Sequence, residues 1–254
     1  SSYIGLNPYE NPCDKIEKQW KKESKVSYFR ALNRNTPADS YQQQQTDLNN
    51  ALRSPEAKIM KEISENKTTT VTDKVNSTLD VSNSSGLSNG EITQLQKHMK
   101  SRVSTRHGVK HEATALESYA VTTGADVQRY TKVLEYTYDE QYKIRGKVDG
   151  VTKGKVVEIK NRARRLFGKV VGYEYCQVQL YMHMLKKPEA DLVESYNGDI
   201  NVYPLEYDQD YVDEVLQKLA AVDILVYELQ ESKTVQNDYF MDREEYVNNR
   251  LHIP

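Results

Sequence analysis

Cysteine and long apolar segments are scarce in this sequence. Its 254 residues include two cysteines, Cys13 and Cys176, which cannot supply the four thiolates of a zinc or iron–sulfur site. Two distant cysteines also give no sign of a secreted disulfide scaffold. No apolar run approaches the roughly 20 residues that span a bilayer, and no signal peptide opens the chain. We therefore expect a soluble, intracellular protein of a reducing compartment, without a membrane partner.

An excess of basic charge is also missing. The chain has 35 Lys and Arg against 37 Asp and Glu, which gives a net charge of −2 at pH 7. The molecule as a whole is not a polycation, so any binding of nucleic acid must come from local patches.

The order of apolar and polar residues indicates an α/β fold with a helical N-terminal region. Within residues 1–90, Ile16 and Trp20 lie four apart and predict one face of a helix. The stretch at about 64–90 is rich in Ser, Thr and Asn, and we expect it to be a partly mobile loop or insertion. Residues 91–254 read as helix, strands, helix, strand and helix, which predicts a core built on a mixed sheet.

Charged residues interrupt two apolar strands in the segment 145–162, RGKVDGVTKGKVVEIKNR. Glu158 and Lys160 are two apart on one strand and therefore face the same side. Asp149 precedes the turn TKGK and is expected to come alongside. Two carboxylates that converge at a strand end suit Mg²⁺ or Mn²⁺, which would bridge a phosphate oxygen and a water. The alternative for these residues is a surface ion pair.

Two acid-free basic stretches, 97–110 and 160–172, flank these carboxylates. One such stretch is most often a solvated face. Two stretches that flank the same carboxylates favour contact with the phosphate backbone of a nucleic acid. Their basic residues are Lys97, Lys100, Arg102, Arg106 and Lys110, then Lys160, Arg162, Arg164, Arg165 and Lys169.

Asp149, followed nine residues later by EIK, resembles the signature of PD-(D/E)xK nucleases. Three more segments are similar, in the same order, to the YqaJ-like viral recombinase and lambda exonuclease family. These four blocks cover about half of the chain, and they imply a restriction-endonuclease-like core. The three segments are IGLNPYENPCDKIEKQW (4–20), GVKHEATALESYAVTTG (108–124) and YCQVQLYMHML (175–185).

The resemblance implies a metal site for Mg²⁺ or Mn²⁺. Asp149 and Glu158 would be direct ligands, with the carbonyl of Ile159 as a third. Glu112, in the segment 108–124, would complete the metal shell directly or through water. The alternative for Glu112 is a glutamate on a helix surface.

The resemblance also implies catalytic and DNA-binding residues. Lys160 would serve the nucleophilic water, and Gln177 would hold that water or the DNA strand. The family often has Pro after E-x-K-x, where this chain has Arg162. The predicted DNA contacts are Arg102, Arg106, Lys110, Arg162, Arg164, Arg165, Gln179 and Tyr181.

Our leading hypothesis is a metal-dependent deoxyribonuclease of viral or phage type. It would act as a 5′→3′ exonuclease on the ends of double-stranded DNA, in recombination or the processing of replication intermediates. A single-strand annealing protein and a second copy of the chain are the expected partners. One alternative is an endonuclease or a shut-off-type nuclease that also cuts RNA. The other is a non-catalytic DNA-binding protein, although three carboxylates facing phosphates would repel DNA without a metal.

Overall fold

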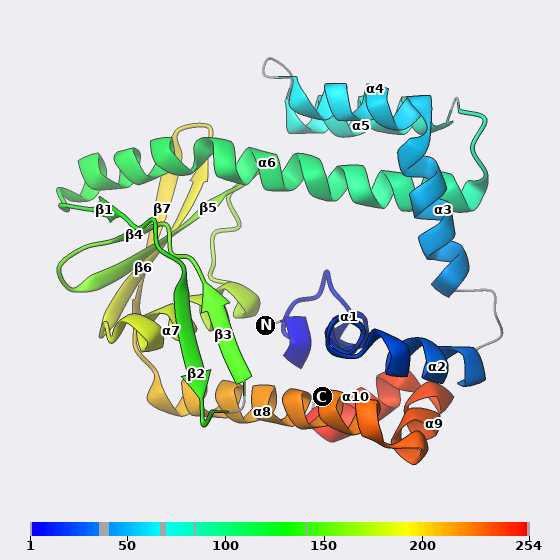
Figure 1. The fold of residues 1–254 in the computed structure, drawn as a ribbon. Helices are drawn as coiled ribbons and strands as arrows, with labels where there is room; N and C mark the ends of the chain where they lie inside the picture. Colours follow the sequence, from blue (N-terminus) through cyan, green and yellow to red (C-terminus); the bar gives the residue numbers. More distant parts are fainter. Residues whose placement is uncertain (1, 36–40, 67–69, 84, 141, 253–254) are drawn as a thin grey trace.

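The computed structural model describes residues 2–35, 41–66, 70–83, 85–140 and 142–252 (Figure 1). In these ranges the chain forms a mixed β-sheet with helices on both faces and a helical N-terminal part. The expected α/β class, with a mixed central sheet flanked by helices and a helical N-terminal part, is therefore confirmed.

The main sheet of the described residues has five strands in the order β1-β4-β5-β6-β7. The pair β5 and β6 is parallel, and its crossover connection contains helix α7 (Gly172–Leu185). The other neighbours in this sheet are antiparallel. Strands β2 and β3 form a separate antiparallel hairpin, so the first of the two strands expected in the segment 145–162 is divided between β3 of this hairpin and β4 of the main sheet. The strands are β1 (Gln128–Arg129), β2 (Leu134–Tyr138), β3 (Tyr142–Gly146), β4 (Gly150–Val151), β5 (Lys155–Asn161), β6 (Glu189–Tyr196) and β7 (Asp199–Glu206).

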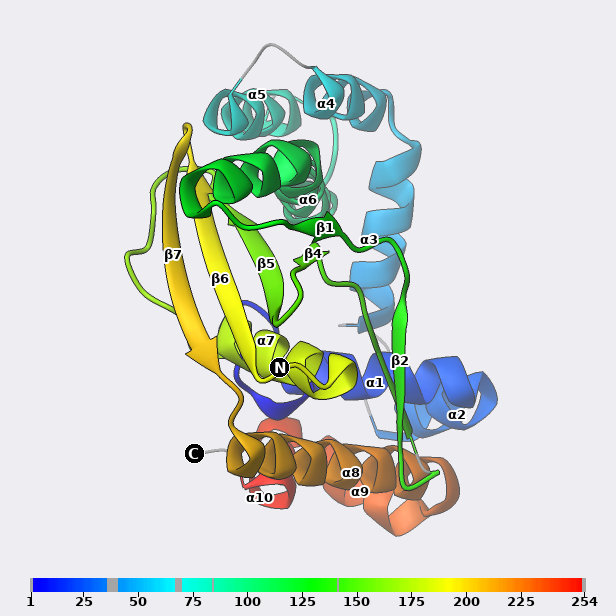
Figure 2. The ribbon, with the colours of Figure 1, turned by 90° about the vertical axis from the view of Figure 1, so that its left-hand side faces the viewer.

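Two helices cover opposite faces of β5 (Figure 2). Val156 packs with Val178 of α7, whereas Val157 packs with Tyr119 of the long helix α6 (Asn89–Thr123). Because side chains alternate along a strand, Glu158 lies on the α7 face with Val156. A capping box of Ser88 and Glu91 begins α6, and Gly124 ends it with φ +68°.

The two ends of the chain share one hydrophobic core. Ile16 and Trp20 are both fully buried on one face of α1, as their spacing predicts. They belong to the same cluster as Val215 of α8 and Tyr239 of α9. The helices of this part are α1 (Pro12–Glu23), α2 (Lys25–Asn35), α8 (Gln209–Glu231), α9 (Lys233–Met241) and α10 (Arg243–Leu251).

The segment expected to be a loop at about 64–90 contains helix α5 (Val71–Asn83), so that expectation is wrong. Its polar residues are satisfied inside a helix: Thr78 Oγ1 donates to the Val75 carbonyl, and Ser82 Oγ donates to the Leu79 carbonyl. Gln96 on α6 also donates to Ser82 Oγ at 2.6 Å. The helix therefore packs on α6 together with α3 (Tyr41–Arg53) and α4 (Pro55–Glu65).

Both cysteines are buried free thiols, and burial raises the pKa of the Cys13 thiol to about 12. Among the described residues, every helix is too short or too polar to cross a membrane.

A buried carboxylate joins the N-terminal helices to the C-terminal ones. Glu17 of α1 is 2% exposed and accepts hydrogen bonds from the hydroxyls of Tyr28 (3.0 Å) and Tyr239 (3.1 Å). Its Oε1 also pairs with Arg243 at 2.6 Å. These three donors come from α2, α9 and α10, so one side chain holds four helices in place.

We expect Glu17→Ala to lower the free energy of unfolding by about 3 kcal/mol, because two buried hydroxyls and one cation lose their shared acceptor. The exposed neighbour on α1 supplies the control: Lys18→Ala should change stability by less than about 0.5 kcal/mol. Urea unfolding followed by circular dichroism measures both. Equal midpoints for Glu17→Ala and the unmodified protein would contradict the assigned role.

Candidate active site

The end of β5 and the bend before β4 bring Asp149 beside Glu158. Asp149 lies in the bend that directly precedes β4, and its Oδ2 accepts a 2.7 Å hydrogen bond from the backbone N–H of Ile159. Glu158, the residue before Ile159 on β5, is 4% exposed. The structure therefore places the two predicted metal ligands on neighbouring segments, Asp149 in the bend before β4 and Glu158 on β5.

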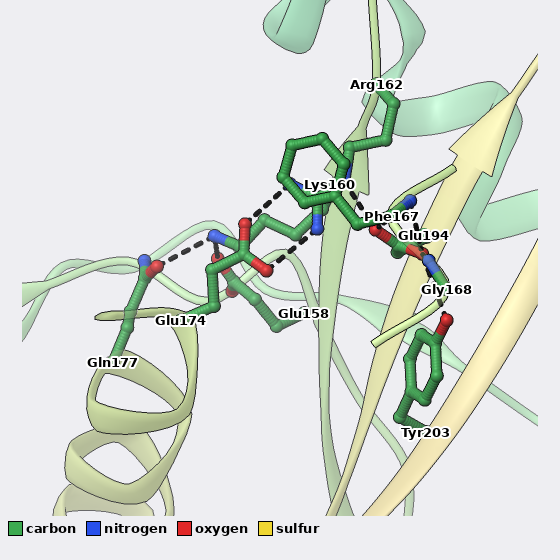
Figure 3. A network of polar contacts seen from close by, with 9 residues as sticks. All are labelled: Glu158, Lys160, Arg162, Phe167, Gly168, Glu174, Gln177, Glu194 and Tyr203. Carbon is green, nitrogen blue, oxygen red and sulfur yellow. Dashed lines mark hydrogen bonds and ion pairs between the residues drawn. The ribbon is translucent and has the colours of Figure 1, made fainter. Parts of the chain in front are cut away.

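Lys160 connects Glu158 to helix α7 (Figure 3). Its Nζ donates to Glu158 Oε1 at 2.9 Å and to Gln177 Oε1 at 2.7 Å. Gln177 Nε2 then donates to the Tyr181 hydroxyl at 2.9 Å. Because Gln177 and Tyr181 are four apart, they lie on one face of α7, and that face is a wall of the site. The structure therefore brings Lys160, Gln177 and Tyr181 into one chain of hydrogen bonds.

Both carboxyl groups of the site have raised pKa values. Burial raises the pKa of Glu158 to about 7; the charge of Lys160 opposes this shift and the charge of Asp149 adds to it. The pKa of Asp149 is also raised, mainly by burial, although the Ile159 N–H opposes the shift. In the described part of the chain, Glu158 Oε2 is buried without a hydrogen-bond partner. An unpartnered, buried carboxylate oxygen beside a second carboxylate fits a divalent cation.

Glu112 of α6 is close enough for its charge to raise the pKa of Asp149 and of Glu158. Its Oε1, however, forms an ion pair with Nη2 of Arg129 on β1, at a distance of 3.1 Å. Within the described ranges, no group of three or more His, Cys, Asp or Glu side chains has a geometry that could hold a metal ion. A cation here would have Asp149 and Glu158 as its carboxylate ligands, and Glu112 would join only after leaving Arg129.

Arg162 is not a surface cation. Its Nη1 and Nη2 donate to the two carboxylate oxygens of Glu174 at 2.6 and 2.8 Å, and its Nε donates to Glu194 at 2.7 Å (Figure 3). The side chain is 9% exposed. The prediction of a direct DNA contact by Arg162 therefore disagrees with the structure, because its guanidinium is hydrogen-bonded to two buried glutamates.

The same network orders the loop between β5 and α7. Glu194, fully buried on β6, also accepts the backbone N–H groups of Phe167 and Gly168 and the hydroxyl of Tyr203. The guanidinium of Arg162 lies 3.9 Å from the centre of the Phe167 ring. Sequence reasoning did not identify Glu194, although an acid inside the apolar segment DLVESY is the same signal that identified Glu158.

Gln179, another predicted DNA contact, lies inside the protein. It is fully buried, and its side chain donates to the Glu206 carbonyl at 2.8 Å and accepts the Asp208 N–H at 2.9 Å. Residues Gln177 and Gln179 are two apart on a helix, so they point in different directions. Gln179 therefore connects α7 to the start of α8 and does not face the site.

The two basic stretches meet around a cavity of about 1140 Å³ between α5, α6 and the loop after β5. Arg106 and Arg164 both line it, as do His107 and Asn161. Arg164 and Arg165 are exposed, whereas Arg102 and Arg106 share an ion pair with Glu65. The side chain of Lys110 lies outside the described part of the chain.

Comparison with known proteins places this site in a family. The model of the YqaJ-like viral recombinase domain matches residues 46–187, more than half of the chain. No curated protein matches. An alkaline exonuclease (LHK-Exo) from Laribacter hongkongensis is similar in structure, with 16% identity, a TM-score of 0.42, and coverage of 50% of this chain and 71% of that one. The same exonuclease in complex with dAMP is 13% identical, with a TM-score of 0.38. That comparison covers 75% of this chain and 89% of the other.

The close approach of β3 to α7 gives a test of the Tyr181 position. A Cβ added at Gly146 would lie 2.3 Å from Tyr181 Cε1, so Gly146→Ala should push this ring away and cost about 1–3 kcal/mol of stability. In a Tyr181→Ala background the same change should cost much less, because the clash is gone.

Thermal or urea unfolding of the four proteins measures this coupling. Gly154→Ala is the matched control, since a Cβ there meets nothing within 4 Å. If Gly146→Ala costs the same with and without the Tyr181 ring, the described contact is wrong.

Proposed function

The chain belongs to the YqaJ-like viral recombinase domain family, and we therefore propose that it is a metal-dependent deoxyribonuclease that acts as a 5′→3′ exonuclease on double-stranded DNA. One observation carries this proposal. Lys160 is fixed beside Glu158 and Gln177, while Glu158 keeps a buried oxygen without a partner next to Asp149. A surface ion pair, the alternative for these residues, would not bury the carboxylate.

Asp149 and Glu158 would hold Mg²⁺ or Mn²⁺ through their carboxylate oxygens, with the Ile159 carbonyl as a further ligand. Such an ion, when bound, supplies positive charge to the phosphate and lowers the pKa of a water. The backbone N–H of Ile159 fixes the Asp149 carboxylate at 2.7 Å and so orients it before any ligand arrives. Glu112 would complete the shell from α6 in exchange for its ion pair with Arg129.

Lys160 would act as a cation that orients the attacking water and stabilises the phosphate, and not as the base. Burial lowers its pKa, but the charge and hydrogen bond of Glu158 more than offset burial, so the net shift is upward. An ammonium group has three N–H donors, and two of them are used by Glu158 and Gln177. The third would remain for the water or for a phosphate oxygen.

The exposed basic residues suit a path for the DNA backbone. Arg164 and Arg165 follow directly on the loop after β5, and Arg106 faces the same cavity from α6. Arg162 serves a positioning role in this proposal, because it orders that loop from inside. A single-strand annealing protein and a second copy of the chain remain the predicted partners.

We expect linear duplex DNA to be degraded with Mg²⁺ and to stay intact with EDTA, while a closed circle survives. Glu158→Gln and Lys160→Met should each reduce the rate about a hundredfold or more, because each removes a group of the reacting site. Glu117→Gln, an exposed glutamate on α6, is the matched control and should keep the rate.

Gel electrophoresis of linear and circular substrates separates the alternatives. Cutting of the circle would replace the exonuclease with an endonuclease, and cutting of RNA would point to a shut-off-type nuclease. If nothing is cut but DNA is bound, the chain is a binding protein and the proposal fails.

The affinity for Mn²⁺ should fall between pH 8 and pH 6. The pKa of Glu158 is about 7, so acidification protonates a metal ligand and a proton then competes with the cation. Isothermal titration with Mn²⁺ measures this, and Glu158→Gln should bind weakly at both pH values. Tight binding to Glu158→Gln at pH 8 would show that the ion lies elsewhere.

A further inference from the structure

An exposed aromatic side chain, Tyr9, meets a half-buried one, Tyr173, near the start of α7. The rings of Tyr9 and Tyr173 contact each other edge to face, with centres 6.1 Å apart. Tyr9 is 76% exposed, whereas Tyr28 and Tyr239 are fully buried. An aromatic ring left this open contributes little to the core and is free to contact a ligand.

The N-terminal turn fixes Tyr9 in this position. Asn7 Oδ1 accepts the backbone N–H of Tyr9 at 3.0 Å, and the Asn7 carbonyl accepts the N–H of Glu10 at 3.2 Å. These bonds form an Asx-turn, which holds the backbone around Tyr9 while its side chain projects outwards. The turn leads directly into α1, whose Asn11 caps the helix. Tyr9 is therefore presented by an ordered segment that the matched residues 46–187 do not include.

The helical period puts Tyr173 on the wall of the active site. Tyr173, Gln177 and Tyr181 are spaced four apart, so they form one row along α7. Gln177 in the middle accepts from Lys160, and Tyr181 closes the inner end of the row. Tyr173 is at the outer end, one helical turn from Gln177. The charges of Lys160 and Arg162 both act on the Tyr173 hydroxyl, which agrees with this proximity.

An aromatic pair next to the proposed nuclease site suits one kind of ligand. An unpaired nucleobase can stack on an aromatic side chain, and this interaction does not depend on which base it is. A base in an intact duplex is already stacked and cannot reach such a ring. The network of Arg162 and Glu174 fixes the first turn of α7, and with it the backbone that carries Tyr173.

We propose that Tyr9 and Tyr173 form a stacking shelf for an unpaired base of the strand whose phosphate reacts beside Lys160. This inference rests on the proposed nuclease function, and it names the two side chains that hold the separated strand at the site. Base stacking on the shelf sets the position of the strand relative to Lys160 and is independent of base identity.

A fluorescent base tests the shelf without requiring cleavage. DNA duplexes with an unpaired tail that carries 2-aminopurine are titrated with Lys160→Met protein, in which we expect cutting to be slowed about a hundredfold or more. We expect quenching of 2-aminopurine on binding. Tyr9→Ala and Tyr173→Ala, each added to Lys160→Met, should remove most of the quenching and raise Kd about tenfold.

Three further variants serve as controls for the quenching experiment. Tyr9→Phe and Tyr173→Phe should retain quenching, because stacking needs the ring and not the hydroxyl. Tyr227→Ala, which removes a tyrosine 66% exposed on α8, should leave quenching and Kd unchanged. Equal quenching in the alanine variants and in Lys160→Met would overturn the inference.

Cleavage kinetics separate this inference from the proposed function. With an otherwise unmodified protein, a tail of abasic nucleotides should raise KM about tenfold, and Tyr173→Ala should no longer distinguish abasic from normal tails. If the unmodified protein cuts both tails with the same KM, the shelf is overturned while the nuclease stands. If it cuts no DNA at all, the proposed function fails, and the quenching result still decides the shelf.

Discussion

The pairing of Lys160 with Glu158 is the interaction on which the rest of the site depends. Both side chains are on the α7 face of β5, where Glu158 is 4% exposed. A buried ion pair rarely adds stability over apolar residues of the same size, because desolvation of the two charges offsets their attraction. Its presence in a central strand is better explained by a reaction than by the fold. The raised pKa of Glu158 shows that Lys160 compensates this burial only in part.

The crossover from β5 to β6 supplies the geometry that this pair needs. Arg162, which directly follows β5, holds Glu174 in the first turn of α7 (Figure 3). That contact places Gln177, one turn later, where it accepts from Lys160. Glu194 of β6 holds Arg162 from the other side. Arg162 thus fixes both the helix and the loop that carries Arg164 and Arg165.

Sequence patterns predicted the parts of the site that follow strand and helix periods. Asp149, Glu158 and Lys160 come together because alternation on β5 and the short turn before it determine where they point. The helical part at 64–90 was missed, since its stability comes from hydroxyls that bond back to the helix and from packing on α6. Composition alone does not reveal such bonds.

Long-range partners explain the other differences. Sequence alone predicts that a basic residue in the segment 160–172 is exposed. Arg162 is internal because Glu174 and Glu194, which are distant in sequence, form ion pairs with it. The amide of Gln179 pairs with backbone groups near residue 207, which no local pattern indicates. Glu112 is on the expected helix, but Arg129 from β1 engages it. In each case the sequence predicted the element, and a distant residue determined the direction of the side chain.

Anomalous diffraction from crystals soaked in Mn²⁺ tests the central claim most directly. The account predicts a strong peak within bonding distance of one oxygen of Asp149 and of the Glu158 oxygen that lacks a hydrogen-bond partner, with Lys160 still paired to Gln177. A peak at another place, or saturating Mn²⁺ with no peak between these two carboxylates, would contradict a metal-dependent nuclease site here.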